Sequence, residues 1–497
     1  MENNENIKKI ISGSLIIILG LFIGKFLNYI FRLIIARLGP DQYGLFSLGL
    51  SVVSFGAILA LMGLDRGTLR FVSYYLGTKD QMKIKGVILY SLKFSIITSL
   101  IFSILIFIFA PQISVKIFHN DSLIKIIKIL AFSIPAYVLS EVLLSIIRAY
   151  REVKYVVYSK NLLEGLSKIV LSLIAIYFGY ALFGISLAYV ISLVVTFVVT
   201  FYFIEKKLFP IFKKDVKTEY NNKQIFSYSW PLMISNIMEL ALIWVDTILL
   251  GYFKTSSEVG IYNAAFPTAM LLTSIPVAIL TLFTPTMSKL IGEKRIEEQK
   301  EIFNITSKWI FLAALPVSII MMYLSKDILK LLFGSSYASG YLALSILAFG
   351  FLISTISFTS RKLLEVYKKS NLILINSMIA IVLNVALNII LIPKFDIIGA
   401  AISSAISFIV YSGLFIMQSI SVLKFRHPIM QYFKIILASV FSLVILILVR
   451  LYLIKNSIIL IVIYGLIYLL LAYLLKIIHK EEFNLLRSLK DKNQNNN

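Results

Sequence analysis

The sequence predicts an all-α protein that crosses a membrane many times and is built from two related halves. Hydrophobic residues make up 59% of the 497 residues, and only 15% are charged. The mean hydropathy of +0.90 is too high for a water-soluble chain of this length. The charged residues cluster between apolar runs of roughly 20 residues, each long enough for one membrane-spanning helix. A turn sequence that occurs in both halves indicates an internal repeat.

About fourteen apolar runs predict the membrane helices. In the first half they cover residues 10–36, 43–64, 86–109, 124–147, 158–178 and 184–204. In the second half they cover residues 226–251, 260–283, 303–324, 341–360, 371–392 and 399–420, and two further runs cover 432–453 and 458–478. The first run is too long for a signal-peptide core and no small-residue cleavage site follows it, so we expect it to stay attached.

A tyrosine–glycine turn marks the repeat. Its copies are Arg37-Leu-Gly-Pro-Asp-Gln-Tyr-Gly-Leu-Phe46 and Ser256-Ser-Glu-Val-Gly-Ile-Tyr-Asn-Ala-Ala265. Aligning Gly44 with Gly260 gives an offset of about 216 residues, which nearly holds further along the chain. Because six runs separate the copies, both keep the same orientation, and we expect a pseudo-two-fold axis along the membrane normal.

Polar segments divide the predicted helices into domains. The lysine-rich segment 205–224 separates a first six-helix lobe, residues 1–204, from a second, residues 225–420. Residues 421–478 carry two helices that have no counterpart in the first lobe. Residues 479–497 form a polar cytoplasmic tail that we expect to be disordered.

The net charge of +23 reflects membrane topology rather than a nucleic-acid partner. With a cytoplasmic amino terminus, Lys and Arg are about four times as frequent in the cytoplasmic segments as in the outer loops. This bias predicts a plasma-membrane protein with both termini in the cytoplasm. No loop is long enough for a nucleic-acid-binding module. The absence of cysteine excludes disulfides and thiolate metal sites, and the three histidines form no metal-site pattern.

Several segments resemble the polysaccharide transporter family of lipid-linked oligosaccharide flippases. Each segment alone is a weak signal, but together they occur in the expected order along nearly the whole chain. They are Arg37-Leu-Gly-Pro-Asp-Gln-Tyr-Gly44, Gly63-Leu-Asp-Arg-Gly-Thr-Leu-Arg-Phe-Val72, Trp244-Val-Asp-Thr-Ile-Leu-Leu-Gly251, Val259-Gly-Ile-Tyr-Asn-Ala-Ala265, Leu332-Phe-Gly-Ser-Ser-Tyr337 and Ile392-Pro-Lys-Phe-Asp-Ile-Ile-Gly-Ala-Ala401. The superfamily also includes multidrug and toxin extrusion antiporters and lipid II flippases. The resemblance implies a V-shaped, two-lobe carrier whose central cavity opens alternately to each side. It also implies envelope polysaccharide assembly proteins as partners.

Charged residues inside the first predicted helix are candidates for substrate binding. A charge at mid-bilayer costs roughly 2.5–3.5 kcal/mol on insertion scales, so each one needs a reason. Lys25, Asn28 and Arg32 form one polar stripe, which we interpret as a cationic wall for a diphosphate. Two alternatives remain open: Arg32 extends to nearby headgroups, or Lys25 forms an ion pair with Glu141.

The fifth predicted helix carries a second candidate group. Lys160, Glu164 and Lys168 lie at i, i+4 and i+8 and so share one face. They either line the cavity or pair within the helix. Glu141, in the fourth helix, either balances these charges or carries a proton. The many Tyr and Phe residues near helix ends are interpreted as an interfacial belt without a sugar-stacking role.

The second half carries candidate ion-coupling residues. Glu239 and Asp246 lie seven residues apart on one face of the seventh helix, and Asn236 adds to this stripe. The eleventh helix adds amide side chains roughly on one side: Asn376, Asn384 and Asn388. Carboxylate and amide oxygens suit Na⁺, whereas a buried carboxylate could carry H⁺ instead. Interhelical hydrogen bonding by the asparagines is the alternative. We expect no other metal and no cofactor.

These observations together predict a flippase rather than an enzyme. As the resemblance implies, it would move a polyprenyl-diphosphate-linked oligosaccharide from the cytoplasmic to the outer leaflet by alternating access coupled to an ion gradient, for cell-surface polysaccharide biosynthesis. The glycan would pass through the cavity while the lipid tail stays among the membrane lipids. The first alternative is a multidrug and toxin extrusion cation antiporter, against which the net basic first lobe argues. The second is a membrane glycan polymerase or ligase, which would need a large outer loop that the sequence lacks.

Overall fold

The computed structural model describes all residues except 1–19, 21, 212–217, 220–221, 454–455 and 478–497. The described residues are almost entirely helical, and they include no strand. The chain forms two compact units, Met1–Asn263 (unit 1) and Ala264–Asn497 (unit 2). The predicted division into lobes at residues 205–224 remains a prediction.

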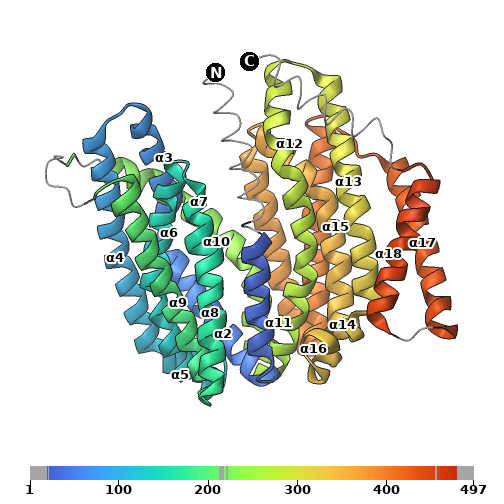
Figure 1. Ribbon diagram of the computed structural model, residues 1–497, viewed down its shortest axis with the longest axis horizontal. Helices are drawn as coiled ribbons and strands as arrows, with labels where there is room; N and C mark the ends of the chain where they lie inside the picture. The colour runs from blue at the N-terminus through green and yellow to red at the C-terminus, as the bar shows by residue number, and fades with distance from the viewer. Residues whose placement is uncertain (1–19, 21, 212–217, 220–221, 454–455, 478–497) are drawn as a thin grey trace. The chain divides into compact units, whose positions relative to one another are not determined.

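Unit 1 starts, in its described part, with a helical segment at residues 22–36 (Figure 1). Its labelled α-helices are α2 (Pro40–Leu61), α3 (Leu64–Gly77), α4 (Gln81–Gln112), α5 (Ser122–Ala131), α6 (Ser133–Ala149), α7 (Val153–Val156), α8 (Glu164–Tyr177), α9 (Ala181–Phe203), α10 (Asn222–Phe253) and the first part of α11 (Ser256–Met270). Three π-helical turns adjoin them: η1 (Ile113–Ile117), η2 (Val157–Leu163) and η3 (Ile204–Leu208). Helix α10 packs against α2 and α3.

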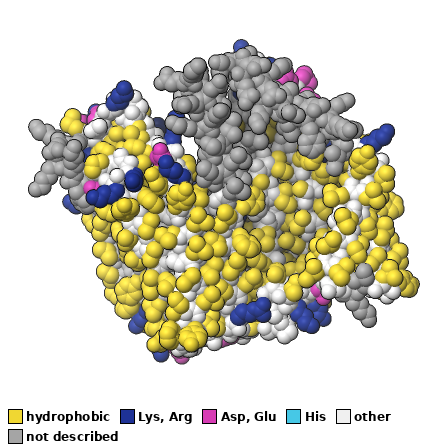
Figure 2. Space-filling view, in the orientation of Figure 1, with side chains coloured by type: hydrophobic (Ala, Val, Ile, Leu, Met, Phe, Trp, Pro, Cys, Tyr) yellow, Lys and Arg dark blue, Asp and Glu magenta, His cyan; other side chains and the backbone are white. Residues whose placement is uncertain are grey.

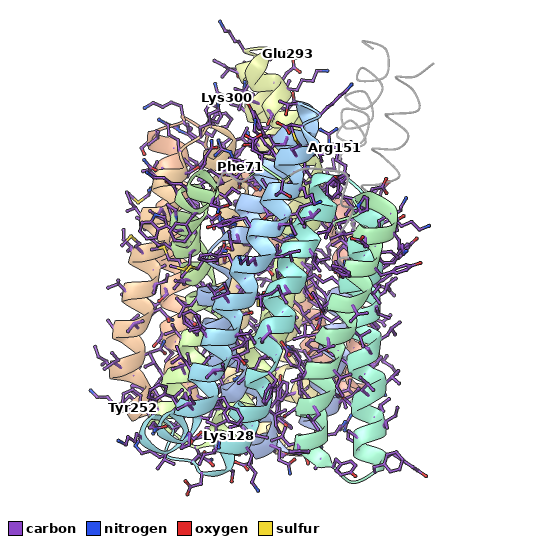
Figure 3. The ribbon with its side chains drawn as sticks, turned by 90° about the vertical axis from the view of Figure 1, so that its left-hand side faces the viewer. Phe71, Lys128, Arg151, Tyr252, Glu293 and Lys300 are labelled. Atoms are coloured by element: carbon purple, nitrogen blue, oxygen red, sulfur yellow. The ribbon has the colours of Figure 1, made fainter. Side chains whose placement is uncertain are left out.

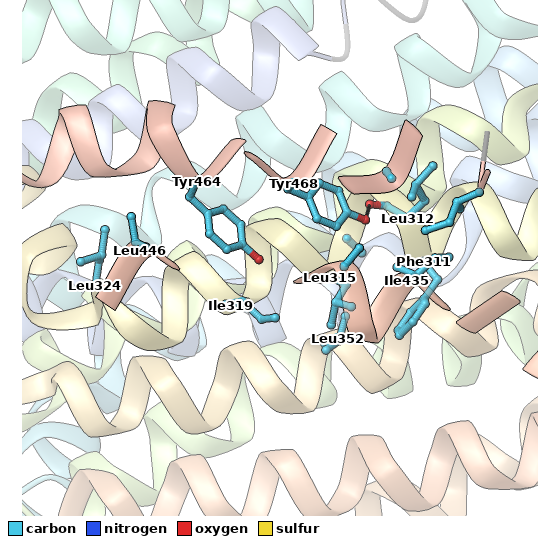
Figure 4. Packing of buried hydrophobic residues seen from close by; sticks show 14 of the residues in the cluster. Phe311, Leu312, Leu315, Ile319, Leu324, Leu352, Ile435, Leu446, Tyr464 and Tyr468 are labelled. Atoms are coloured by element: carbon cyan, nitrogen blue, oxygen red, sulfur yellow. Dashed lines mark hydrogen bonds between the residues drawn. The ribbon is translucent and has the colours of Figure 1, made fainter. Parts of the chain in front are cut away.

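Unit 2 continues from α11. Its elements are η4 (Leu271–Thr273), α12 (Ser274–Gly292), α13 (Ile296–Tyr323), α14 (Ser325–Leu332), η5 (Ser335–Gly340), α15 (Tyr341–Val366), α16 (Ser370–Ser421), α17 (Ile429–Tyr452) and α18 (Ser457–Leu474). Helices α17 and α18 lie side by side and pack against α13 (Figure 1). Figure 4 shows the apolar cluster at this contact, where the Tyr468 hydroxyl of α18 donates a hydrogen bond of 2.8 Å to the Leu312 carbonyl of α13.

Eleven helical segments of the described chain are long and apolar enough to cross a membrane. The count is lower than the predicted fourteen for three reasons. The first predicted helix lies partly outside the described residues, and the fifth is divided by η2. Helix α16 joins the eleventh and twelfth predicted helices across Asp396, whose φ of 53° breaks the helical geometry. The predicted fold class, an all-α multi-pass membrane protein, is confirmed.

Helix α4 shows why the chain belongs in a bilayer. Ser91, Ser95, Ser99 and Ser103 recur every four residues and are buried on its inner face. Large side chains such as that of Ile104 are exposed on the opposite face. Small residues inside let membrane helices approach closely, while the apolar face meets lipid. Figure 2 shows the same pattern on one face of the protein, with hydrophobic side chains over the helices and Lys and Arg toward their ends.

The helices of unit 1 alternate in direction as predicted. Figure 3 places Phe71 and Arg151 toward one end of the unit and Lys128 and Tyr252 toward the other. Phe71 and Arg151 belong to segments that the charge bias predicts to face the cytoplasm. Tyr252 lies in a predicted outer loop, and Lys128 lies within the fourth predicted helix, near its outer end.

Candidate functional site

The two predicted cationic groups of unit 1 lie together. Lys168 of α8 is 4% exposed, and its Nζ donates a hydrogen bond of 3.1 Å to Asn28 Oδ1. The same Nζ lies 2.6 Å from Glu164 Oε1, one helical turn away. Asn28 also donates to the Gly24 carbonyl at 2.9 Å. Asn28, Lys168 and Glu164 therefore link the first helix to α8, and we call these residues, together with Arg32 one turn after Asn28, the cationic network.

Arg32 continues this network toward α2. Its Nη1 donates to the Tyr43 hydroxyl at 3.3 Å, and Tyr43 donates to the Asn263 carbonyl at 3.0 Å. Arg32 is half-buried, whereas Lys25 is exposed two turns earlier on the helix. The structure therefore places Arg32 against the repeated turn.

Glu141 of α6 is the anion of a second ion cluster. Its carboxylate accepts a hydrogen bond from Lys160 Nζ, and its Oε2 lies 3.7 Å from Arg148 Nη2. Glu141 is buried, so both cations are needed to balance its desolvation. Lys160 thus pairs with Glu141, while Glu164 pairs with Lys168.

Asp65 is a carboxylate that sequence reasoning did not single out. It lies in the first turn of α3, and its charge interacts with those of Glu141, Arg66 and Arg148. Its buried Oδ1 has no hydrogen-bond partner within the part of the chain that the structure describes. The available signal was its place between two glycines in the Gly63-Leu-Asp-Arg-Gly67 motif.

A cavity of about 220 Å³ lies in unit 1 between α2, α6, α9 and α10. Its lining includes Ser54, Ala57, Ser133, Tyr137, Tyr189 and Trp244. No charged side chain lines it among the described residues. Lys168 Nζ lies 5.2 Å from the centroid of the Tyr189 ring, so the charged network borders the cavity. Sequence reasoning missed these aromatic residues because it assigned the chain's many Tyr and Phe residues to an interfacial belt.

The two acidic residues of α10 have different surroundings. Asp246 is 2% exposed, and the Tyr262 hydroxyl of α11 donates to its Oδ2 at 2.5 Å. Beside this pair, Asn263 Nδ2 donates to Thr247 Oγ1 at 3.1 Å. Glu239 is exposed and lies 3.6 Å from Arg66 of α3. Asn236 is half-buried one turn before Glu239.

The predicted asparagines belong to unit 2. Asn388 Nδ2 donates to Asn384 Oδ1 at 3.1 Å, and Asn384 Nδ2 donates to Ser404 Oγ at 3.4 Å. Asn376 and Gln418 exchange two hydrogen bonds of 2.9 Å. The Asn384–Ser404 and Asn376–Gln418 bonds join the two halves of α16, on either side of Asp396, and so fit the alternative of interhelical hydrogen bonding. The described residues contain no group of three His, Asp or Glu side chains that could hold a metal ion.

Comparison with known proteins gives concordant results. The family model described as "Polysaccharide biosynthesis protein" matches residues 10–291, and the MatE model matches residues 231–390. The chain is 28% identical over 453 residues to an uncharacterized membrane protein of Methanocaldococcus jannaschii, covering 86% of this chain and 87% of that relative. It is 25% identical over 387 residues to a Shigella flexneri protein named "Putative O-antigen transporter", covering 74% and 87%.

A solved structure of the lipid II flippase MurJ, in an inward closed conformation, has a similar fold. The TM-score is 0.74 at 17% sequence identity, and the match covers 93% of this chain and 98% of that one. At this identity the similarity concerns the fold alone. It agrees with the all-α, multi-pass architecture of the described residues.

Proposed function

Because this chain belongs to the polysaccharide biosynthesis protein family of membrane transporters, we propose that it is a flippase for a lipid-linked oligosaccharide. It is a transporter rather than an enzyme. Its substrate is a polyprenyl-diphosphate-linked oligosaccharide, which it moves from the cytoplasmic to the outer leaflet of the plasma membrane by alternating access. Both termini are cytoplasmic, as the distribution of Lys and Arg favours.

The observation that carries this proposal is the connected cationic network of unit 1. Lys168 is bound to Asn28 and Glu164, and Arg32 is held by Tyr43. Lys and Arg donate charge-assisted hydrogen bonds to phosphate oxygens. Glu164 balances the charge of Lys168, so Arg32 gives this group its net positive charge. A diphosphate headgroup has the charge and the oxygen atoms that this network can bind.

Ion coupling belongs to the same proposal. Asp246 is buried and hydrogen-bonded to Tyr262, so its carboxyl can exchange H⁺ or contribute an oxygen ligand to Na⁺. Glu239 and Asn236 on the same helix, and Asn384 and Asn388 in unit 2, are the further coupling residues. The similarity to MatE proteins over residues 231–390 supports a gradient-driven carrier.

Translocation of a fluorescent polyprenyl-diphosphate oligosaccharide in sealed proteoliposomes tests this function. The purified protein should make the inner-leaflet pool of the lipid accessible to an added membrane-impermeant quencher at a rate well above that of protein-free vesicles. Transport of a cationic dye in the same vesicles, without movement of the lipid, would instead support the cation antiporter. The same assay with imposed Na⁺ or H⁺ gradients identifies the coupling ion.

A further inference from the structure

We propose that the unit 1 cavity binds one neutral pyranose ring, the sugar attached directly to the diphosphate of the lipid-linked glycan. This inference rests on the proposed flippase function and specifies which part of the substrate unit 1 recognises. Two features of unit 1 support it: the residues that line the cavity, and the contact between the cavity wall and the cationic network.

The volume of the cavity limits the ligand to a single small ring. It measures about 220 Å³, below the roughly 300–1,000 Å³ of pockets for drug-sized ligands. A multi-ring drug or a complete oligosaccharide exceeds this space, whereas one six-membered ring with its hydroxyl groups fits it.

The lining combines aromatic faces with hydroxyl groups. Tyr137, Tyr189 and Trp244 supply rings that can pack on the apolar C–H face of a sugar. Tyr189 is fixed by packing against Phe31 and Phe46, at centroid distances of 6.3 and 5.9 Å. A ring held in advance loses little conformational entropy when a ligand binds.

The hydroxyl groups are available for a polar ligand. Neither phenol hydroxyl, of Tyr137 or of Tyr189, hydrogen-bonds to another residue in the described ranges. The Ser54 hydroxyl donates to the Leu50 carbonyl at 2.6 Å and the Ser133 hydroxyl to the Leu130 carbonyl at 2.5 Å, which leaves their oxygens free to accept. An acyl chain would leave both phenol hydroxyls without partners, which is unfavourable. A sugar offers both donors and acceptors to them.

The position of the cavity selects the sugar nearest the phosphate. Lys168 lies over the Tyr189 ring and binds Asn28, so the cationic network begins where the cavity wall ends. A diphosphate bound to this network would place its attached sugar at the cavity.

Trp244 provides a direct reporter of occupancy. The chain has three tryptophans, and replacing the other two by Trp230→Phe and Trp309→Phe leaves Trp244 alone. Two probes in detergent solution are compared: farnesyl diphosphate, and farnesyl diphosphate carrying a single hexose or N-acetylhexosamine. The sugar-bearing probe should change Trp244 emission and bind more tightly than the sugarless one. Identical emission changes and affinities for the two probes would overturn the inference.

Substitutions at Tyr137 separate the sugar contact from the diphosphate contact. In this single-tryptophan background, Tyr137→Ala should weaken binding of the sugar-bearing probe on the order of tenfold and leave binding of sugarless farnesyl diphosphate unchanged. Tyr137→Phe, which keeps the ring, should weaken binding of the sugar-bearing probe only about fivefold. Tyr177→Ala, at an exposed tyrosine outside the cavity, is the matched control. Equal losses for both probes would show that Tyr137 has only a structural role and would contradict the inference.

The outcomes distinguish this inference from the underlying function. If vesicles containing the protein translocate the lipid-linked oligosaccharide but Trp244 responds equally to both probes, the flippase remains and the sugar pocket is wrong. If neither probe binds and no lipid is translocated, the proposed function is wrong as well.

Discussion

Gly44 of α2 and Gly260 of α11, the two residues that align the internal repeat, pack directly against each other. A Cβ on Gly44 would lie 2.9 Å from the Gly260 amide nitrogen, and a Cβ on Gly260 would lie 3.0 Å from the Gly44 amide nitrogen. The Cβ on Gly44 would also lie 1.7 Å from the Ser256 carbonyl oxygen, and the Cβ on Gly260 would lie 1.9 Å from the Pro40 carbonyl oxygen. The contact is reciprocal, since each glycine meets backbone atoms of the other copy of the turn.

Gly44→Ala is expected to destabilise the protein by about 3 kcal/mol, because the backbones of α2 and α11 must separate to admit a methyl group. Gly413→Ala in α16 is the matched control, since a Cβ there meets no atom within 4 Å. The control should be neutral or slightly stabilising, as Ala is a better helix former than Gly. Unfolding of the detergent-solubilised variants measures both effects, and equal stability of the two would refute the close contact.

The ion cluster around Glu141 gives a second prediction. Glu141→Gln removes the anion and leaves Lys160 and Arg148 as uncompensated, half-buried cations. We expect a loss of about 1–3 kcal/mol in unfolding free energy. Adding Lys160→Gln should recover part of this loss, because one of the two excess charges is then removed. A double variant less stable than Glu141→Gln alone would contradict the pairing.

The attachment of α18 to α13 is tested at Tyr468. Tyr468→Phe removes the hydrogen bond to the Leu312 carbonyl and leaves that buried oxygen without this donor (Figure 4). The expected cost is about 1 kcal/mol. Tyr473→Phe on the same helix alters a side chain that is 71% exposed and should change the unfolding free energy little. If the two substitutions had similar effects, Tyr468 would not be the residue of α18 that contacts α13.

His427, between α16 and α17, makes stability depend on pH. Burial lowers the pKa of His427 from 6.5 to about 4. Its Nε2 lies 2.8 Å from Ser360 Oγ and its Nδ1 lies 2.9 Å from Tyr432 Oη, which suits a neutral ring. Below pH 6.5 the unfolded chain therefore takes up a proton that the folded chain does not, and stability falls until the pH reaches about 4.

Through His427, the free energy of unfolding should be about 2 kcal/mol lower at pH 5 than at pH 7.5. Unfolding at the two pH values, in the wild type and in His427→Gln, isolates the contribution, since other groups titrate alike in both proteins. The variant should lose about 2 kcal/mol less than the wild type on acidification. Equal losses would show that His427 is not held neutral.

The sequence indicated the membrane helices well because each needs an apolar run of bilayer length. It could not show the packing of α10 against α2 and α3, since both halves of a repeat present similar apolar faces. The prediction that Lys160, Glu164 and Lys168 share one face assumed a regular α-helix. The π-helical turn at residues 157–163 changes the angle between successive side chains, and Lys160 consequently reaches Glu141 while Lys168 keeps Glu164.

The cavity could not be predicted from the sequence, for a different reason. With 27 tyrosines and 36 phenylalanines in the chain, no spacing distinguishes Tyr137 and Tyr189 from the aromatic residues at helix ends. Only the packing of four helices shows that these two rings meet Trp244 around one space. The cationic residues were easier to find, because a charge within an apolar run is conspicuous.

We propose that the cationic network of unit 1 binds the diphosphate of a lipid-linked glycan. The most direct measurement is the initial rate of translocation of a polyprenyl-diphosphate oligosaccharide into the quencher-accessible leaflet of proteoliposomes. Lys168→Gln and Arg32→Gln should each lower this rate at least about tenfold, and Lys116→Gln, at an exposed lysine of η1, should not. Wild-type rates in the folded Lys168→Gln and Arg32→Gln proteins would contradict the account.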